Sequence, residues 1–218
     1  MRIAIIGGTG RQGPGMALRW AKAGHAVVIG SRQQEKAARI AAELNQSLQQ
    51  NLIQGMVNAE AAQWGEVIAI TVPYAAHRST LEQIRPQVQG KIVIDVTVPL
   101  DPQNPRRLLF PPQGSATAEA QEILGDQAQV VAAFQHIPAP ALRNIDEPLE
   151  ADVLVCGEST QAKDTVIKLI QQMGMRGLDV GPLAHAPIVE GITLLLMTLN
   201  RRYKGGHAAI RITGLPEL

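Results

Sequence analysis

The sequence predicts an α/β protein built on a doubly wound parallel sheet, with a smaller C-terminal α/β cap domain. Runs of β-branched residues alternate with segments of helical periodicity along most of the 218 residues. The first apolar run ends in a cluster of glycines, and two later runs each end in Val-Pro. Such alternation is typical of parallel sheets whose connecting helices cover both faces.

The chain opens with an expected strand at 2–6, followed directly by a glycine-rich turn. This turn, Gly7-Gly8-Thr9-Gly10-Arg11-Gln12-Gly13, fits both G-x-G-x-x-G and G-x-x-G-x-x-G. Glycines at this spacing allow a tight turn, close approach of the backbone to a pyrophosphate and close packing of helix on strand. Pro14 suits the first turn of a helix running to about residue 23. The free N–H groups of that helix would face the diphosphate of a dinucleotide in a Rossmann-type fold.

The second expected strand, 25–29, leads into a turn without an acidic residue. An NAD site usually places Asp or Glu there to bind the ribose hydroxyls. This chain offers Ser31, Arg32 and, one helical turn later, Lys36. Arginine grips a phosphate through two hydrogen bonds, so the turn predicts NADP(H) rather than NAD(H). A glycine turn followed by a merely solvated basic helix start is the alternative.

Two later strands mark the edge of the sheet at which a ligand is expected. The pattern predicts a helix at 33–50, a strand at 53–57, a helix at 58–64, strands at 66–72 and 91–98, and a helix between them at 74–87. Proline cannot continue a sheet ladder, so Val72-Pro73 and Val98-Pro99 mark the carboxyl edge. Ligands of open parallel sheets bind beyond that edge. We therefore expect Val72, Pro73 and Val98 to flank the nicotinamide half of the cofactor.

The remainder divides at about residue 140. A proline-rich loop (100–114), a helix at 115–124 capped by Ser115 and a strand at 129–134 complete a cofactor-binding domain, 1–140. Residues 141–218 form the smaller domain, predicted to complete the acceptor site and a dimer interface, with strands ending at 156 and 180, a helix at 159–173 and a long helix at 187–203. Apolar residues cover most of the long helix's circumference, which fits a homodimer seam or an ordinary core helix.

Composition narrows the function class and the location. The net charge of +1 and an aromatic content of 3% give no support to a nucleic-acid partner. The single cysteine, Cys156, excludes an intrachain disulfide and suits a reducing cytoplasm. We expect no signal peptide, because the first strand follows Met1 directly. The longest apolar stretch, 188–199, is expected to be too short to span a membrane.

Few residues offer acid–base chemistry. There is no H-E-x-x-H, no paired cysteine and no G-x-S-x-G, so a metal site and acyl transfer have no support. Among five histidines, His25 is expected to be structural and His77 is ambiguous. His136 follows a strand at the carboxyl edge and is the best candidate for a pocket residue, with a backbone-bonded loop histidine as the alternative. The basic tail is either a clamp for an anionic acceptor or a solvated face; its members are Arg201, Arg202, Lys204, His207 and Arg211.

Taken together, these motifs resemble the F420-dependent NADP oxidoreductases over nearly the whole chain. The resemblance rests on the glycine turn, Gly30-Ser31-Arg32, Val72-Pro73, Ile137-Pro138-Ala139 and Asn200–Lys204. It implies hydride exchange between NADPH and the deazaflavin ring of coenzyme F420, in a dimer of two-domain subunits. By position it assigns Thr9, Arg11, Gln12, Ser31, Arg32 and Lys36 to NADP binding, and Val72, Val98 and Ala139 to the nicotinamide. One departure is Gln135, where some members of the family have histidine.

The resemblance also suggests where the acceptor binds. Coenzyme F420 carries a phosphate and a glutamate tail, which suits the bases Arg202, Lys204 and His207, while His136, Ile137 and Pro138 would flank the ring. Direct hydride transfer needs stacked rings more than an acid–base pair, so no certain catalytic residue is expected. The alternatives are another NADPH-dependent reductase, of the imine or flavin/metal type, and a non-catalytic NADP(H) sensor. A sensor would not need the basic tail or the 137–139 loop.

Overall fold

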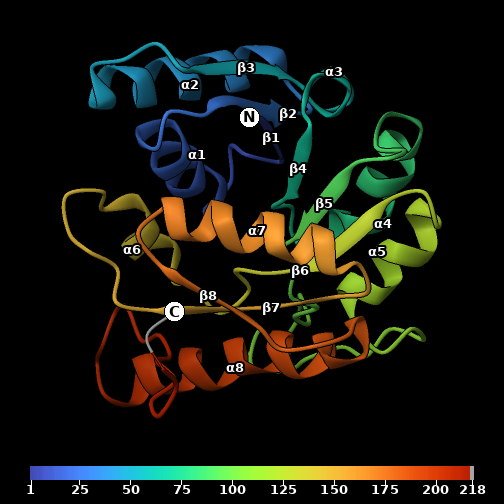
Figure 1. Ribbon diagram of the computed structural model, residues 1–218, viewed down its shortest axis with the longest axis vertical. Helices are drawn as coiled ribbons and strands as arrows, with labels where there is room; N and C mark the ends of the chain where they lie inside the picture. The colour runs from blue at the N-terminus through green and yellow to red at the C-terminus, as the bar shows by residue number, and fades with distance from the viewer. Residues whose placement is uncertain (217–218) are drawn as a thin grey trace.

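The computed structural model describes residues 1–216 and shows eight strands in one sheet (Figure 1). The strand order is β3-β2-β1-β4-β5-β6-β7-β8, and every neighbouring pair is parallel except β6 and β7. The strands are β1 (Arg2–Ile6), β2 (Ala26–Ser31), β3 (Ile53–Val57), β4 (Val67–Ile70), β5 (Ile92–Asp95), β6 (Gln129–Ala132), β7 (Asp152–Gly157) and β8 (Arg176–Asp179). The predicted α/β class and doubly wound sheet are thereby confirmed.

Helices cover both faces of the sheet. They are α1 (Gly13–Lys22), α2 (Gln34–Leu48), α3 (Asn58–Trp64), α4 (Tyr74–Ile84), α5 (Ala116–Leu124), α6 (Ala139–Arg143), α7 (Thr160–Gln172) and α8 (Ala186–Arg202), with 3-10 turns at Arg85–Gln87 and Leu183–His185. One apolar cluster joins α1, α2, α6 and α7 to one face of the sheet. A second joins α3, α4 and α5 to the other face, and a third seats α8 over β7 and β8. Both faces are therefore buried, which explains why the strands are continuous apolar runs.

Most predicted elements are present, and the shortened ones have local causes. The expected strand at 66–72 stops at Ile70, because both the N–H and the hydroxyl of Thr71 bond to the Ile6 carbonyl, at 2.9 and 3.0 Å. The expected strand at 129–134 stops at Ala132, because Phe134 adopts a left-handed φ of 71°. Ser115 caps α5 as predicted, since its hydroxyl accepts the Ala118 N–H. Helix α6 was not predicted.

Residues beyond 140 extend the sheet of the first unit. Strand β7 pairs antiparallel with β6, matching Val131 with Gly157 and Ala132 with Cys156. The first cluster contains side chains from both sides of residue 140, including Trp20 on α1 and Leu169 on α7. The Trp20 indole N–H donates to the Leu169 carbonyl at 3.3 Å. The division at residue 140 thus remains a prediction about units that share one sheet.

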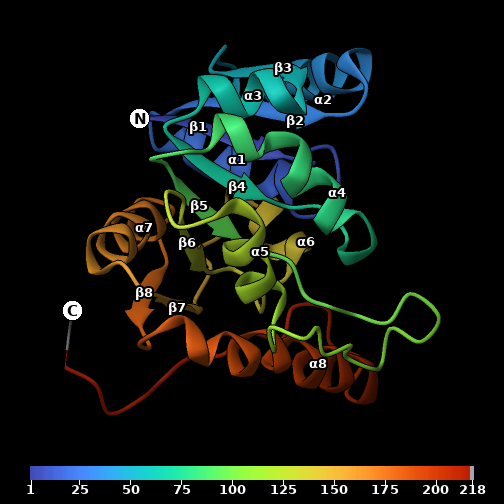
Figure 2. The same ribbon diagram turned by 90° about the vertical axis from the view of Figure 1, so that its right-hand side faces the viewer.

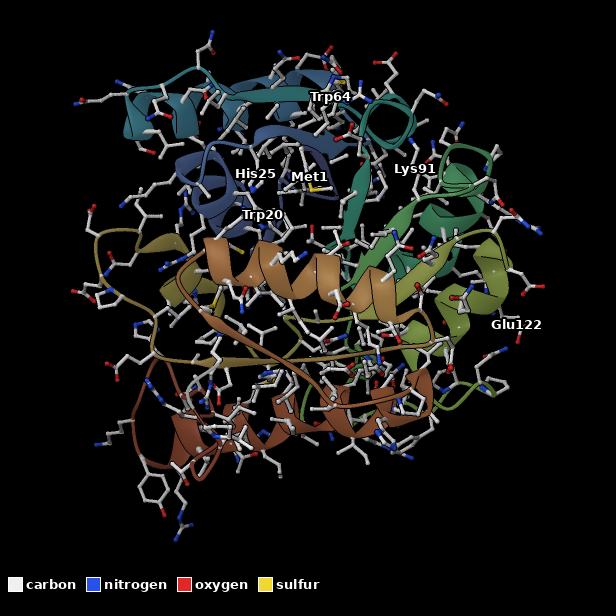
Figure 3. The ribbon with its side chains drawn as sticks, viewed as in Figure 1. Met1, Trp20, His25, Trp64, Lys91 and Glu122 are labelled. Carbon is white, nitrogen blue, oxygen red and sulfur yellow. The ribbon has the colours of Figure 1, made fainter. Side chains whose placement is uncertain are left out.

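The N-terminus and α1 are bound to α7 by polar contacts. His25 lies 3.3 Å from the Met1 amino group and 2.8 Å from the Gln172 Oε1 (Figure 3). The buried guanidinium of Arg19 donates to five backbone carbonyls, those of Ala141, Leu142, Asn144, Glu147 and Met173. His25 therefore has the structural position that the sequence predicted. Arg19 connects α1 to the segment that follows β6 and to the end of α7.

Helix α8 packs on the rest of the subunit through one side only. Its buried residues are Ala186, Val189, Glu190 and Leu196, so the predicted homodimer seam on the other side remains a prediction. Together with the preceding 3-10 turn, it forms a segment of 20 residues with mean hydropathy 1.3, Leu183–Arg202, which is long and apolar enough by composition to cross a membrane. Length therefore does not separate this helix from a membrane span, contrary to the sequence prediction.

Candidate functional site

The glycine turn (Gly7–Gly13) follows β1 at the carboxyl edge of the sheet. Gly7 has a φ of 71°, and a Cβ there would come within 2.4 Å of the Val72 Cγ1. A Cβ on Gly13 would lie 2.4 Å from the Gly8 Cα, so α1 packs directly on the turn. Gly10 is exposed, with its nearest atom at 3.3 Å. Gly7 and Gly13 therefore shape the turn, and Gly10 leaves the open surface that a diphosphate needs.

The basic turn (Gly30–Lys36) follows β2 beside the glycine turn. The Gly8 N–H donates to the Gly30 carbonyl at 2.9 Å, which joins the two turns. Ser31 is buried and its hydroxyl accepts the Gln33 N–H, whereas Arg32 and Lys36 are exposed. Within residues 1–216 neither of these two bases forms an ion pair. Two free cations beside the glycine turn are an arrangement that suits a 2′-phosphate.

Asn58, the first residue of α3, supports the glycine turn and was not predicted from the sequence. Its side chain is buried, and Oδ1 accepts the Gly7 N–H at 3.3 Å. The same oxygen lies 2.8 Å from where a Cβ on Gly30 would be. Asn58 thus occupies the space between the two turns, and only the position of an asparagine at a helix start could have drawn attention to it.

The glycine turn is also connected to the acceptor loop (Phe134–Pro138). The Gln12 side-chain amide donates to the carbonyls of Phe134 and Ile137, at 3.4 and 3.1 Å. Val72 and Val98 follow β4 and β5 at the same edge and are half-buried, and Pro73 is exposed. Ala139 begins α6 immediately after the loop. The structure therefore brings together the residues that the sequence placed around the nicotinamide, while Gln12 uses its amide within the protein.

His136 does not face the crevice, contrary to the sequence prediction. Its imidazole is 2% exposed, and Nε2 lies 3.0 Å from the Asp152 carbonyl on β7. The tight turn at Phe134, closed by the Ile137 N–H bonding to the Phe134 carbonyl, directs the ring inward. Burial lowers the pKa of His136, which favours the neutral form of the ring. The backbone-bonded loop histidine is the alternative that the structure supports.

A buried charged cluster beneath the crevice was also missed. His77 on α4 and Asp95 at the end of β5 are fully buried, with Nε2 and Oδ2 2.9 Å apart. Glu119 on α5 lies 3.7 Å from the other ring nitrogen and 2.6 Å from Arg78. Burial lowers the pKa of His77, but the two carboxylates more than offset this and raise it above its usual value. An aspartate ending the apolar run 92–95 was the available signal.

Asp95 also fixes the backbone that continues into the predicted nicotinamide wall. Its Oδ1 accepts the Thr97 N–H at 3.0 Å, and its carbonyl accepts the Gln135 side-chain amide at 2.8 Å. The Gln135 carbonyl in turn accepts the Thr193 hydroxyl of α8 at 2.9 Å. The cluster therefore links β5, the acceptor loop and α8 under the crevice.

The tail bases are exposed but do not all share one place. Arg201 and Arg202 lie in the last turn of α8, with Lys204 and His207 just beyond. Arg211 pairs with Glu150 at 3.7 Å, beside β7, so it is not free. Figure 2 shows the loop after β5 and the end of α8 on the side of the molecule where the parallel strands end. A role of the C-terminal bases at the acceptor therefore remains a prediction, and it concerns the bases at the end of α8 rather than Arg211.

Comparison with known proteins identifies the family. Residues 2–99 match the family described as NADP oxidoreductase coenzyme F420-dependent. The chain is 43% identical to the F420-dependent NADP reductase of Methanocaldococcus jannaschii, over 99% of both chains. The chain belongs to this family. It is also 41% identical to the F420-dependent NADP reductase of Methanothermobacter marburgensis, over 100% of both chains.

A solved structure shows that the similarity to F420-dependent NADP oxidoreductases extends to the fold. The crystal structure, from Arthrobacter sp. FB24 and described as a candidate F420-dependent NADP reductase, superposes with a TM-score of 0.83. It covers 97% of this chain and 98% of its own, at 24% identity. The likeness therefore concerns the arrangement of the whole chain, including β7, β8 and α8.

Proposed function

We propose that this protein is an oxidoreductase that transfers a hydride between NADP(H) and the deazaflavin coenzyme F420. The observation that carries the proposal is the bond of Gln12 to the acceptor loop, which joins a cofactor site with Ser31 and Arg32, and no acid, directly at the end of β2 to the loop proposed to lie beside the acceptor. The family membership and the full-length identity to F420-dependent NADP reductases support the same activity.

The residues of the two turns supply the cofactor contacts. The glycine turn, including Thr9 and Arg11, and the start of α1 would hold the diphosphate. Ser31, Arg32 and Lys36 would hold the 2′-phosphate. NAD(H) lacks this phosphate, and its ribose hydroxyls would find no acidic partner directly after β2. Val72, Pro73, Val98 and Ala139 would line the nicotinamide. NADPH supplies the hydride when bound, so the protein's task is to place the two rings in contact.

The acceptor side would be formed by the loop and the C-terminal bases. Ile137 and Pro138 continue the acceptor loop beside Gln12 and would flank the deazaflavin ring. Arg202, Lys204 and His207 are exposed near the end of α8 and are available to its anionic groups. His136 would act only through the backbone that it holds, because its imidazole bonds to β7. Reduction of the acceptor consumes one proton besides the hydride, and this proton is available from solvent at an open crevice.

The proposal includes a cytoplasmic homodimer. Helix α8 exposes large apolar side chains on its free side, with Ile188 and Leu195 67% and 64% exposed. An unpartnered apolar helix face is typical of an interface between subunits. We do not expect a membrane to cover this face, because the helix contains Glu190, whose carboxylate accepts the N–H groups of Ala116 and Thr117 at the start of α5. The free, buried Cys156 suits a reducing compartment, and the near-neutral charge favours no nucleic acid.

The test is to mix the purified protein with NADPH and oxidised F420 and to follow the deazaflavin absorbance. We expect the absorbance of oxidised F420 to fall only when the protein and NADPH are both present, and to fall much more slowly when NADH replaces NADPH. Flavin mononucleotide, ferric chelates and a cyclic imine serve as control acceptors for the alternative reductases. Bound NADPH that is oxidised by none of the acceptors would indicate a sensor, and oxidation by a control acceptor alone would indicate another reductase.

A further inference from the structure

A cavity of about 360 Å³ lies between the loop after β5 and the C-terminal half of α8. Its volume falls within the range of small-molecule sites. The cavity is lined by Pro105, Arg106, Leu194, Met197, Thr198 and Arg201. It thus combines two guanidinium groups from separate segments of the chain with an apolar wall contributed by α8.

Both guanidinium groups of the cavity are available to a ligand. Neither Arg106 nor Arg201 forms an ion pair within the described part of the chain, residues 1–216. The nearby Asp101 carboxylate accepts the Gln103 N–H at 2.8 Å and so serves its own turn. The Thr198 hydroxyl donates to the Leu194 carbonyl at 2.9 Å. The donors that remain belong to the two arginines, which suits phosphate or carboxylate oxygens.

The loop that carries Arg106 is anchored beside the predicted nicotinamide wall. The Leu109 N–H bonds to the Pro99 carbonyl at 2.7 Å, one residue after Val98. Leu100 and Leu108 also form an isolated antiparallel bridge. The loop is therefore a closed arm whose base is at the crevice and whose outer part meets α8 (Figure 2). The arm therefore connects the backbone beside Val98 to the cavity lining at Pro105 and Arg106.

We propose that this cavity holds the anionic tail of the acceptor, with Arg106 and Arg201 binding its phosphate and carboxylate groups. This inference rests on the proposed function and specifies it. It replaces the tail-binding role given above to Arg202, Lys204 and His207, because these residues do not line the cavity, whereas Arg106 and Arg201 do. Arg202 instead lies over the ring of Tyr203, 6.0 Å from its centroid. The deazaflavin ring is then positioned by the acceptor loop, and the tail adds affinity without touching the reacting atoms.

The experiment compares two acceptors in steady-state kinetics: F420 and its deazariboflavin core, which has the same ring without the phosphate and glutamate groups. Arg106→Ala and Arg201→Ala should each raise KM for F420 roughly tenfold or more, as expected for loss of a charge-assisted hydrogen bond. KM for the deazariboflavin and kcat for either acceptor should stay unchanged. Arg107→Ala is the matched control, because this exposed neighbour carries the same charge in the same loop but lies outside the cavity lining. Arg201→Lys should recover only part of the loss, since lysine cannot bind bidentately.

Equilibrium dialysis of oxidised F420, without NADPH, gives the second measurement. A rise in Kd for the two alanine variants but not for the control supports the cavity even if the wild-type protein transfers no hydride, so failure of the activity and failure of the site are distinguishable. Unchanged KM and Kd for F420, or an equal rise in KM for F420 and for the deazariboflavin, would overturn the proposal. A comparable effect from Arg107→Ala would also overturn it, because general charge attraction would then explain the result.

Discussion

The basic turn after β2 and the buried charged cluster of His77, Asp95 and Glu119 place charged side chains in opposite environments. Arg32 and Lys36 are exposed and form no ion pair within residues 1–216, so their charge is free to meet a ligand. His77 and Asp95 are fully buried and face each other, with Nε2 and Oδ2 2.9 Å apart. The difference shows that proximity to the crevice does not make a charged residue a binding residue. A base is available to a ligand only where the fold leaves it without a partner.

Removing half of the buried pair should have the largest effect. Asp95→Asn leaves His77 without its closest counter-charge in the interior, and we expect the free energy of unfolding to fall by about 3–5 kcal/mol. Urea denaturation followed by circular dichroism measures it. Glu43→Gln, which breaks the exposed pair with Arg39, is the control and should cost at most about 0.5 kcal/mol. Similar losses in both variants would remove the contrast between buried and exposed charge.

The pH dependence of the free energy of unfolding should come from buried titratable groups. Glu190 accepts N–H groups of Ala116 and Thr117, yet burial raises its pKa to about 7. A carboxyl group whose pKa is raised on folding favours the folded state when protonated, so wild-type stability should decline as pH rises from about 4.5 through 7. Glu190→Gln should flatten this decline in denaturant titrations at several pH values. The raised pKa of His77 adds to the decline above about pH 6.5, whereas the lowered pKa of His136 opposes the decline below that pH, so the variant should keep part of the slope only at the higher pH values.

Removing a free base should change cofactor use and leave stability unaffected. Arg32→Ala should weaken NADPH binding by about 1.5–3 kcal/mol, the value of a hydrogen bond to a charged group. NADH binding should be unaltered, so the preference for NADPH narrows. Titration of both cofactors, with Arg39→Ala as a control of equal charge in the following helix, measures the change. A loss of unfolding free energy in Arg32→Ala, with unaltered cofactor preference, would place Arg32 with the structural charges.

The smallest effect on catalysis is expected at His136. Because its imidazole bonds to the Asp152 carbonyl away from the crevice, His136→Ala should destabilise the protein by about 1–3 kcal/mol through the unpaired buried carbonyl and lost packing. The hydride-transfer rate, measured in single turnovers, should fall by much less than the ~100-fold typical of losing a general acid. A fall of that size in a protein of normal stability would make His136 a catalytic residue.

The sequence predicted the secondary structure around the two turns well because these elements are local. The glycine turn and the basic turn are each encoded in a few consecutive residues, and strand, turn and helix follow in order. The acceptor side depends on contacts between distant segments, such as Gln12 with Ile137 and Asp95 with His77. No spacing rule reveals these partners. His136 was misplaced for the same reason, since its direction depends on the left-handed backbone at Phe134.

The buried guanidinium of Arg19 has a consequence for synthesis of the chain. Its five carbonyl acceptors lie between residues 141 and 173, so they leave the ribosome more than 100 residues after Arg19 itself. Until residues 141–173 have been synthesised, the Arg19 guanidinium has none of these acceptors and stays hydrated. The nascent N-terminal half therefore cannot reach its final packing. The Arg19 contacts therefore make completion of the first half a late event in translation, and deletions within 141–173 should disturb a nucleotide site whose own residues are all intact.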